Sequence, residues 1–174
     1  MAASTQISLE EYLHTSYEPD AEYVDGEIEE RNVGEWDHNT VQGFIWLWFV
    51  ENSKKWRIRS AIEQRTLLNP RRVRIPDVSV FRRDLPIEQV FTYPQLIAIE
   101  VLSPEDRQSR LQQRIQDFID FGVRNIWVID PKLRIGWDCG DGNWTRKERF
   151  EVADSAIYLS LDELFLKIDE DESD

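Results

Sequence analysis

The sequence predicts an α/β domain, because short apolar strand patterns alternate along it with amphipathic helix patterns. Two apolar segments, residues 73–81 (VRIPDVSVF) and 96–102 (LIAIEVL), lack a helical stripe and are too short for buried helices. A helix pattern over 103–122 separates them from residues 125–130 (NIWVID), which read as another buried strand. At 174 residues, 41% of them hydrophobic, the chain is long enough to bury a real core.

The N-terminal third predicts a short helix, a hairpin and a longer helix. Ser8 followed by a glutamate three positions on is a capping box, and the helix it starts should end near Thr15. Residues 21–31 read as a β-hairpin around Asp25-Gly26. Asp37 is expected to cap the second helix. Its core-facing residues recur at helical spacing: Val41, Phe44, Ile45, Trp48 and Phe49.

Residues 56–68 are expected to form a strand pair or one bent strand, and Asn69-Pro70 marks the turn after them. Within 73–81, Pro76 removes a ladder donor, so that strand should be irregular or at an edge near Asp77.

Strand 96–102 carries Glu100 in its middle. Period-two alternation places Ala98 and Leu102 on the face of Glu100, and Ile97, Ile99 and Val101 on the other face.

Asp77 and Glu100 are the first candidate functional residues, because a carboxylate inside an apolar strand must be compensated by hydrogen bonds or a cation. Consecutive strands are usually neighbours, so the two side chains can converge on one ion. Taken singly, each could equally cap a turn or pair with an arginine.

The helix over 103–122 has clear limits, with Ser103 as N-cap and Gly122 as the stop. On one side it carries three arginines at i, i+3 and i+7 spacing. Arg107 and Arg110 are interpreted as a solvated helix face. Arg114 is expected to lie along the core and reach the end of the neighbouring strand.

The C-terminal part predicts a second hairpin, in which residues 134–139 pair with 144–150. A short capped helix over 160–165 follows. We expect one domain over 1–168, and the acidic residues 169–174 to form a disordered tail.

The net charge of −13 argues against a nucleic-acid partner, but its distribution weakens that objection. Residues 54–83 hold ten basic against two acidic residues, a net charge of +8, which leaves −21 for the rest of the chain. A local basic surface can bind phosphates. The alternative is that these arginines are solvated partners of the acidic N-terminal segment. The candidate phosphate contacts are Arg71, Arg72, Arg74, Arg82 and Arg83.

Several classes of function are excluded or disfavoured by missing motifs. The sequence has no CxxC, no HExxH and no phosphate-binding glycine loop, and only His14 and His38 could assist a nucleophile. His38 alone is more typical of a capping or packing residue. The lone Cys139 cannot form an internal disulfide, and no apolar run reaches membrane-spanning length. Without a recognisable signal peptide, we expect a cytoplasmic protein that does not associate with membranes.

An ordered set of motifs carries a family resemblance. IPDV, AIEVLSP, a helix with a basic residue near its middle, and FGVRNIWVIDP occur in that order, together with EYVDGEI and the helix from His38. Over roughly residues 8–150 the chain resembles the Uma-type family of restriction-endonuclease-like proteins in the PD-(D/E)XK superfamily. The resemblance implies a restriction-endonuclease-like mixed β-sheet core flanked by α-helices, to which the two terminal hairpins are additions.

The resemblance also implies a site. Glu22, Asp77 and Glu100 would bind one or two Mg²⁺ or Mn²⁺ ions, with His38 beside them, in an endonuclease that hydrolyses DNA. The superfamily lysine would normally lie at Leu102; in this family it is displaced to the position of Arg114. Arginine can clamp a phosphate but cannot accept a proton at ordinary pH.

Two other functions stay open. The first is an inactive nuclease fold that serves as a nucleic-acid or protein interaction module, with Arg114 paired to Glu100. The second is a metal hydrolase acting on a small phosphate. By analogy with enzymes that cut both strands, we expect a homodimer.

Overall fold

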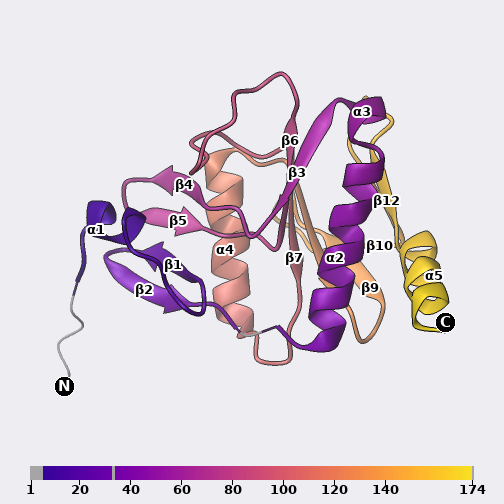
Figure 1. Cartoon of the computed structure of the whole chain (residues 1–174), viewed down its shortest axis with the longest axis horizontal. Coiled ribbons are helices and arrows are strands. Elements are labelled where there is room, and N and C mark those ends of the chain that lie inside the picture. The colour runs from indigo at the N-terminus through magenta and orange to yellow at the C-terminus, as the bar shows by residue number, and fades with distance from the viewer. Residues whose placement is uncertain (1–5, 33, 174) are drawn as a thin grey trace.

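A six-stranded mixed sheet forms the centre of the computed structural model, which describes residues 6–32 and 34–173 (Figure 1). The strand order is β10-β9-β8-β7-β6-β3. Strands β7 and β8 are parallel, and the other neighbouring pairs are antiparallel. The strands are β3 (Ile58–Ile62), β6 (Val78–Arg82), β7 (Ile97–Val101), β8 (Asn125–Asp130), β9 (Ile135–Asp138) and β10 (Thr145–Lys147).

Two smaller sheets complete the strand structure. A four-stranded sheet has the order β2-β1-β5-β4 and a two-stranded sheet pairs β11 with β12. The predicted N-terminal hairpin is β1–β2, and Asp25 and Gly26 have positive φ at its turn. The strands are β1 (Ala21–Val24), β2 (Glu27–Glu30), β4 (Thr66–Asn69), β5 (Arg72–Arg74), β11 (Arg149–Glu151) and β12 (Tyr158–Ser160).

Helices cover both faces of the central sheet. Figure 1 shows α4 on one face and α2 with α5 on the other. The helices are α1 (Leu9–Leu13), α2 (Trp36–Glu51), α3 (Ser53–Trp56), α4 (Gln108–Phe121) and α5 (Leu161–Glu172). None of those described is long and apolar enough to cross a membrane. The predicted α/β class, the mixed sheet flanked by helices and both terminal hairpins are confirmed.

The apolar segment 73–81 is not one strand. Its first residues form β5 in the four-stranded sheet, and its last form β6 in the central sheet. The chain changes sheets between Arg74 and Val78, where Pro76 has no N–H to donate to a ladder. β6 pairs with β7 as expected. In the same way, 56–68 contributes β3 to one sheet and β4 to the other, and 144–150 is divided between β10 and β11.

Three predicted helix ends are wrong. α2 begins one residue earlier than Asp37, and α4 begins at Gln108 rather than after Ser103. Ser103 and Asp106 instead form a turn before the helix, held by two hydrogen bonds between them. The Ser103 N–H donates to Asp106 Oδ2 at 2.7 Å, and the Asp106 N–H donates to the Ser103 carbonyl at 3.1 Å. α5 runs on through Glu172 because its apolar stripe extends to Ile168 and Arg134 pairs with Asp169 at 2.6 Å. The acidic tail is thus helical up to Glu172.

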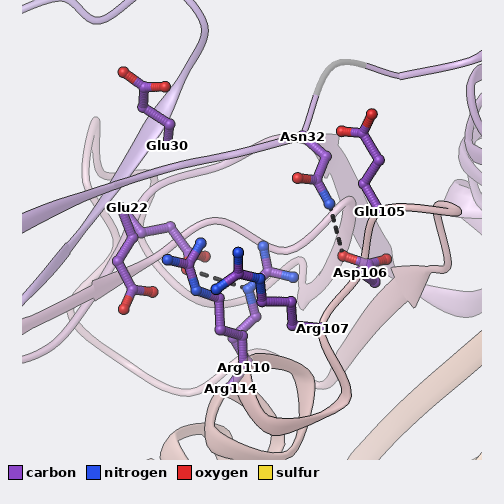
Figure 2. A pocket seen from close by; sticks show the side chains of 9 residues that line it. Glu22, Glu30, Asn32, Glu105, Asp106, Arg107, Arg110 and Arg114 are labelled. Carbon is purple, nitrogen blue, oxygen red and sulfur yellow. Dashed lines mark hydrogen bonds and ion pairs between the residues drawn. The ribbon is translucent and has the colours of Figure 1, made fainter.

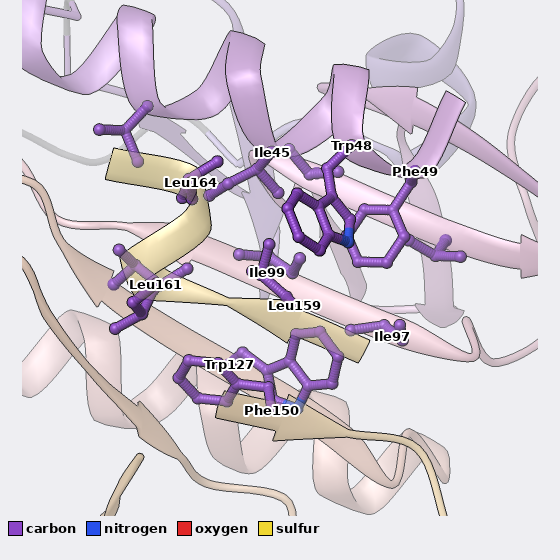
Figure 3. Close-up of a cluster of buried hydrophobic side chains, with 14 of the residues drawn as sticks. Ile45, Trp48, Phe49, Ile97, Ile99, Trp127, Phe150, Leu159, Leu161 and Leu164 are labelled. Carbon is purple, nitrogen blue, oxygen red and sulfur yellow. The ribbon is translucent and has the colours of Figure 1, made fainter. Parts of the chain in front are cut away.

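Two apolar cores lie on opposite faces of the central sheet. The larger packs α2, α5 and the β11–β12 hairpin against the sheet, and Figure 3 shows its aromatic side chains from α2, β8 and β11. The smaller core packs α4 against the other face. Strand β7 contributes to both as predicted, since Ile97, Ile99 and Val101 belong to the larger core and Ala98 to the smaller. Glu100 therefore lies on the α4 face.

Candidate active site

Four residues from four separate elements meet at one end of the central sheet. Glu22 lies on β1, Asp77 at the crossing from β5 to β6, Glu100 on β7 and Arg114 on α4. The three acidic residues are buried, with 1–2% of their surface exposed. Buried carboxylates need compensating charge or hydrogen bonds, and each finds a different set of partners.

Glu22 is held by donors on both oxygens. Its Oε1 accepts the backbone N–H of Ile75 at 2.8 Å, and its Oε2 accepts from Arg74 at 2.6 Å and Arg114 at 3.2 Å. Burial alone would raise the pKa of Glu22, but Arg114, Arg74 and the Ile75 N–H outweigh it and hold the pKa below its usual value. Glu22 is therefore an ionised anchor for two guanidinium groups.

Asp77 is equally well satisfied. Its Oδ2 accepts the Val101 N–H at 2.7 Å and lies 3.4 Å from His38 Nε2, while Arg31 donates to its Oδ1. Burial opposes ionisation, but the His38 hydrogen bond and the Arg31 charge lower the pKa of Asp77. The same contact with Asp77 outweighs burial at His38 and raises its pKa. His38 thus lies beside the carboxylates, where the resemblance placed it.

Glu100 is the exception among the three acids. Its Oε2 accepts from Arg114 at 3.1 Å, but its buried Oε1 has no hydrogen-bond partner among the described residues. Burial raises the pKa of Glu100 to about 8; the Arg114 charge opposes this rise, and the charges of Asp77 and Glu22 add to it. This pKa favours the protonated carboxyl group at neutral pH, whereas a cation bound at Oε1 would favour the ionised form.

Arg114 bridges Glu22 and Glu100. Its side chain is 15% exposed, so its stem lies in the protein while its head remains partly accessible, as its helix spacing predicts. Glu100 and Glu22 outweigh burial and raise the pKa of Arg114 further above its ordinary range. The guanidinium stays charged and can act as an electrostatic clamp.

Two arginines of the site were not predicted for it. Arg31, at the end of the N-terminal hairpin, pairs with Asp77 and lies 3.6 Å from Glu63. Nothing in the sequence around Arg31 indicates this contact. Arg74 was a candidate phosphate contact, and that prediction is wrong: the residue is 1% exposed and its guanidinium pairs with Glu22 and with Asp117, both at 2.6 Å.

The other predicted phosphate contacts do not share one face with each other. Arg71 is exposed, and Arg72 is 18% exposed and pairs with an acidic residue of the β1–β2 turn. Arg82 ends β6 and Arg83 follows it, about 16 Å of strand away from Asp77. The positive segment 54–83 is thus distributed over two sheets and both ends of the central one.

The site offers two carboxylates, Asp77 and Glu100, to a divalent cation rather than a complete set of ligands. The described residues contain no group of three His, Cys, Asp or Glu side chains that could hold a metal, and both oxygens of Glu22 are engaged. Asp77 and Glu100 supply hard carboxylate oxygens. One of these oxygens, Glu100 Oε1, has no hydrogen-bond partner among the described residues. Asp77 also lines a cavity of about 40 Å³, which has room for a water molecule. Mg²⁺ typically binds one or two carboxylates and keeps several waters, so this pair suits it.

A larger polar cavity of about 250 Å³ adjoins Glu22 and Arg114 (Figure 2). One wall carries Arg110 and Arg114 of α4 and Arg107, the residue just before the helix. The expectation that the first two are merely a solvated helix face is incomplete, because both line this cavity. Their i, i+3, i+7 spacing was visible in the sequence, but the cavity depends on β1 and β2 packing nearby.

Sequence and structure comparisons identify the family and the fold. The model of the Uma2 family, described as "Putative restriction endonuclease", matches residues 9–159. The chain belongs to the Uma2 family. Its fold is similar to a crystal structure described as a "putative nuclease belonging to DUF820" from Anabaena variabilis ATCC 29413, with a TM-score of 0.76 at 23% identity, covering 92% of this chain and 98% of that one. No curated protein matches the chain in sequence.

The Uma2 match includes Glu22, Asp77, Glu100 and Arg114. The predicted family and the predicted restriction-endonuclease-like fold are therefore confirmed. Within the Uma2 domain, the site residues converge from positions separated by up to 92 residues in the chain.

Proposed function

We propose that this Uma2 protein is a divalent-metal-dependent nuclease that hydrolyses phosphodiester bonds in DNA. The observation that carries the proposal is the convergence of Asp77, Glu100 and Arg114 on one buried site next to an arginine-lined cavity. Nucleases of the restriction-endonuclease-like class generally use divalent metal ions, and a nuclease family implies a nucleic-acid substrate.

Asp77 and Glu100 would hold the Mg²⁺ or Mn²⁺ ion, and Glu22 would serve as the anchor of Arg114. When bound, the metal supplies an activated water and stabilises charge on the phosphoryl oxygens. Glu100 must release its proton to bind, while Asp77 is already ionised by Arg31 and His38. Arg31 competes with the ion for Asp77 because it donates to the same carboxylate.

Arg114 would contact the oxygens of the phosphate at which cleavage occurs. Glu22 and Glu100 fix its guanidinium from two sides, which keeps it oriented before substrate arrives. Because the group does not lose its proton, its contribution is electrostatic, and it does not act as a general base.

A second candidate function is a nuclease fold that binds nucleic acid without cleaving it. The observation favouring it is that arginines already occupy the acidic side chains: Arg114 donates to Glu22 and Glu100, and Arg31 pairs with Asp77. Breaking buried ion pairs is costly, so metal binding would be weakened by this network.

The proposed enzyme is a homodimer that associates through α2. The outward face of this helix exposes Trp46, Leu47 and Val50 by 37–38%, which is unusual for a solvent-facing helix surface. Sedimentation equilibrium should detect a dimer that Trp46→Glu dissociates and Trp144→Glu, at a similarly exposed tryptophan elsewhere, does not.

Plasmid nicking tests the nuclease function directly. With Mg²⁺ or Mn²⁺ the wild type should nick DNA, and Arg114→Ala should reduce the rate by about 10²-fold or more, because it removes a donor aimed at the reacting phosphate. Arg114→Lys should retain or raise activity, since it restores the superfamily's residue. Circular dichroism should show that both variants keep the fold.

Two outcomes would contradict the proposal. Equal Mn²⁺ binding in calorimetry by the wild type and by an Asp77→Ala, Glu100→Ala double variant would show that the carboxylates do not hold the ion. If neither the wild type nor Arg114→Lys cleaves DNA with any divalent metal, the non-cleaving function replaces the nuclease. Cleavage by Arg114→Lys alone would identify a nuclease disabled by its arginine.

A further inference from the structure

Arg107 and Arg110 continue the side of α4 that carries Arg114. Arg110 and Arg114 lie about one turn apart on α4, and Arg107 is the extended N-cap residue just before the helix. Figure 2 shows the three guanidinium groups side by side on the same wall of the cavity.

Arg107 and Arg110 differ from the other arginines near the site in having no acidic partner. Arg31, Arg74 and Arg114 each pair with buried carboxylates. Among the described residues, neither Arg107 nor Arg110 makes a side-chain hydrogen bond or an ion pair. Each therefore presents its full planar set of donors to a ligand, the geometry that suits phosphate oxygens.

The acidic residues that line the cavity leave this wall positive. Glu22 and Glu29 pair with Arg74, so their charges are balanced inside the protein. Asp106 accepts from Asn32 and from the Ser103 N–H, which orient it without cancelling its charge. Glu30 and Glu105 remain, and Figure 2 shows them on the side of the cavity away from the three arginines. An anion entering the cavity is thus attracted to α4 and repelled from the opposite wall.

We propose that Arg107 and Arg110 form a binding subsite for the phosphates of the DNA strand that lie next to the one held by Arg114. The three guanidinium groups line one wall of the cavity, so each can contact a different phosphate of one DNA strand. The inference rests on the proposed function in one respect, since it takes DNA as the ligand. It does not depend on the nuclease reaction, because the subsite can bind DNA without a metal ion and without cleavage.

The test is DNA binding in EDTA, where cleavage cannot occur. Fluorescence anisotropy with a labelled duplex should show that Arg107→Gln, Arg110→Gln lowers affinity roughly tenfold or more at low salt. It should also reduce the slope of log affinity against log salt by about 2, because each of the two arginines neutralises one phosphate. Glu105→Gln should raise affinity, because it removes a repelling charge from the opposite wall.

The matched control is Arg82→Gln, Arg83→Gln, which makes the same charge change at the other end of β6. It should lower affinity much less. Equal reductions for the two double variants would mean that only net charge matters, and an unchanged affinity and slope for Arg107→Gln, Arg110→Gln would exclude the subsite. Wild type that binds no DNA would overturn it as well.

Failure of the nuclease function gives a different result. In that case the wild type would bind DNA through Arg107 and Arg110 in EDTA but show no nicking when Mg²⁺ or Mn²⁺ is added. The subsite would then stand as the binding surface of a non-cleaving protein.

Discussion

Ile99 and Glu100 are consecutive residues of β7, yet they lie in opposite environments. Ile99 points into the large core with α2 and α5, where neighbouring side chains are apolar and fully buried. Glu100 points to the α4 side, where Arg114, Asp77 and Glu22 surround it. Both residues are at most 2% exposed, so burial alone does not distinguish them.

The two faces of β7 are stabilised by different physical effects. On the α2 side, burial of apolar surface stabilises the fold without specific partners. On the α4 side, charges are stable only as a connected set, because each carboxylate or guanidinium left alone would be costly. A site of this kind holds ionisable groups in place for chemistry, while the opposite face supplies the stability that it requires.

The largest effect should come from breaking the charge network at Arg74. Arg74→Met removes the partner of Glu22 and Asp117 and leaves buried negative charge, so the free energy of unfolding should fall by about 3–5 kcal/mol. Urea denaturation measures it. Arg82→Met is the exposed control and should leave the midpoint nearly unchanged. Similar midpoints for both variants would show that the network adds no stability.

An effect that depends on pH is expected at Glu100. Because its pKa is raised from 4.5 to about 8 in the folded protein, its contribution is fully present below pH 4.5 and is lost as the pH rises towards 8. Relative to Glu100→Gln, the wild type should lose stability across that window, with a slope of up to about 1.4 kcal/mol per pH unit. Denaturation in EDTA at several pH values measures the difference. Parallel stability curves would mean that Glu100 is not protonated in the fold.

The smallest effect should come from the neighbour of Glu100. Ile99→Val removes one methylene group from the large core and should cost about 0.5–1.5 kcal/mol. No charge lies on that face of β7, so the cost should be the same at pH 5 and pH 8. A cost that varied with pH would show that the two faces are energetically coupled, and the contrast drawn between them would fail.

Local patterns in the sequence were sufficient for much of the fold. Alternation along 96–102 correctly placed Ile97, Ile99 and Val101 opposite Glu100, and Gly122 ended α4 in the left-handed conformation expected of it. Errors arose where a non-local contact competed with a local signal. Ser103 was a good capping residue by type, but its turn is closed by Asp106 and held by Asn32, 71 residues away.

By itself, the sequence determined the family motifs, the order of the elements, the buried strands and the candidates Asp77, Glu100 and Arg114. It could not determine how the buried charges pair, because pairing depends on which elements become neighbours. Arg74 was indistinguishable from Arg71 and Arg72 in a basic segment, until pairing of β1 with β5 brought it against Glu22. Arg31 meets Asp77 across 46 residues for the same kind of reason. The cost of an unpaired charge depends on its surroundings after folding, so only the tertiary structure decided which arginines are internal partners and which remain available to a ligand.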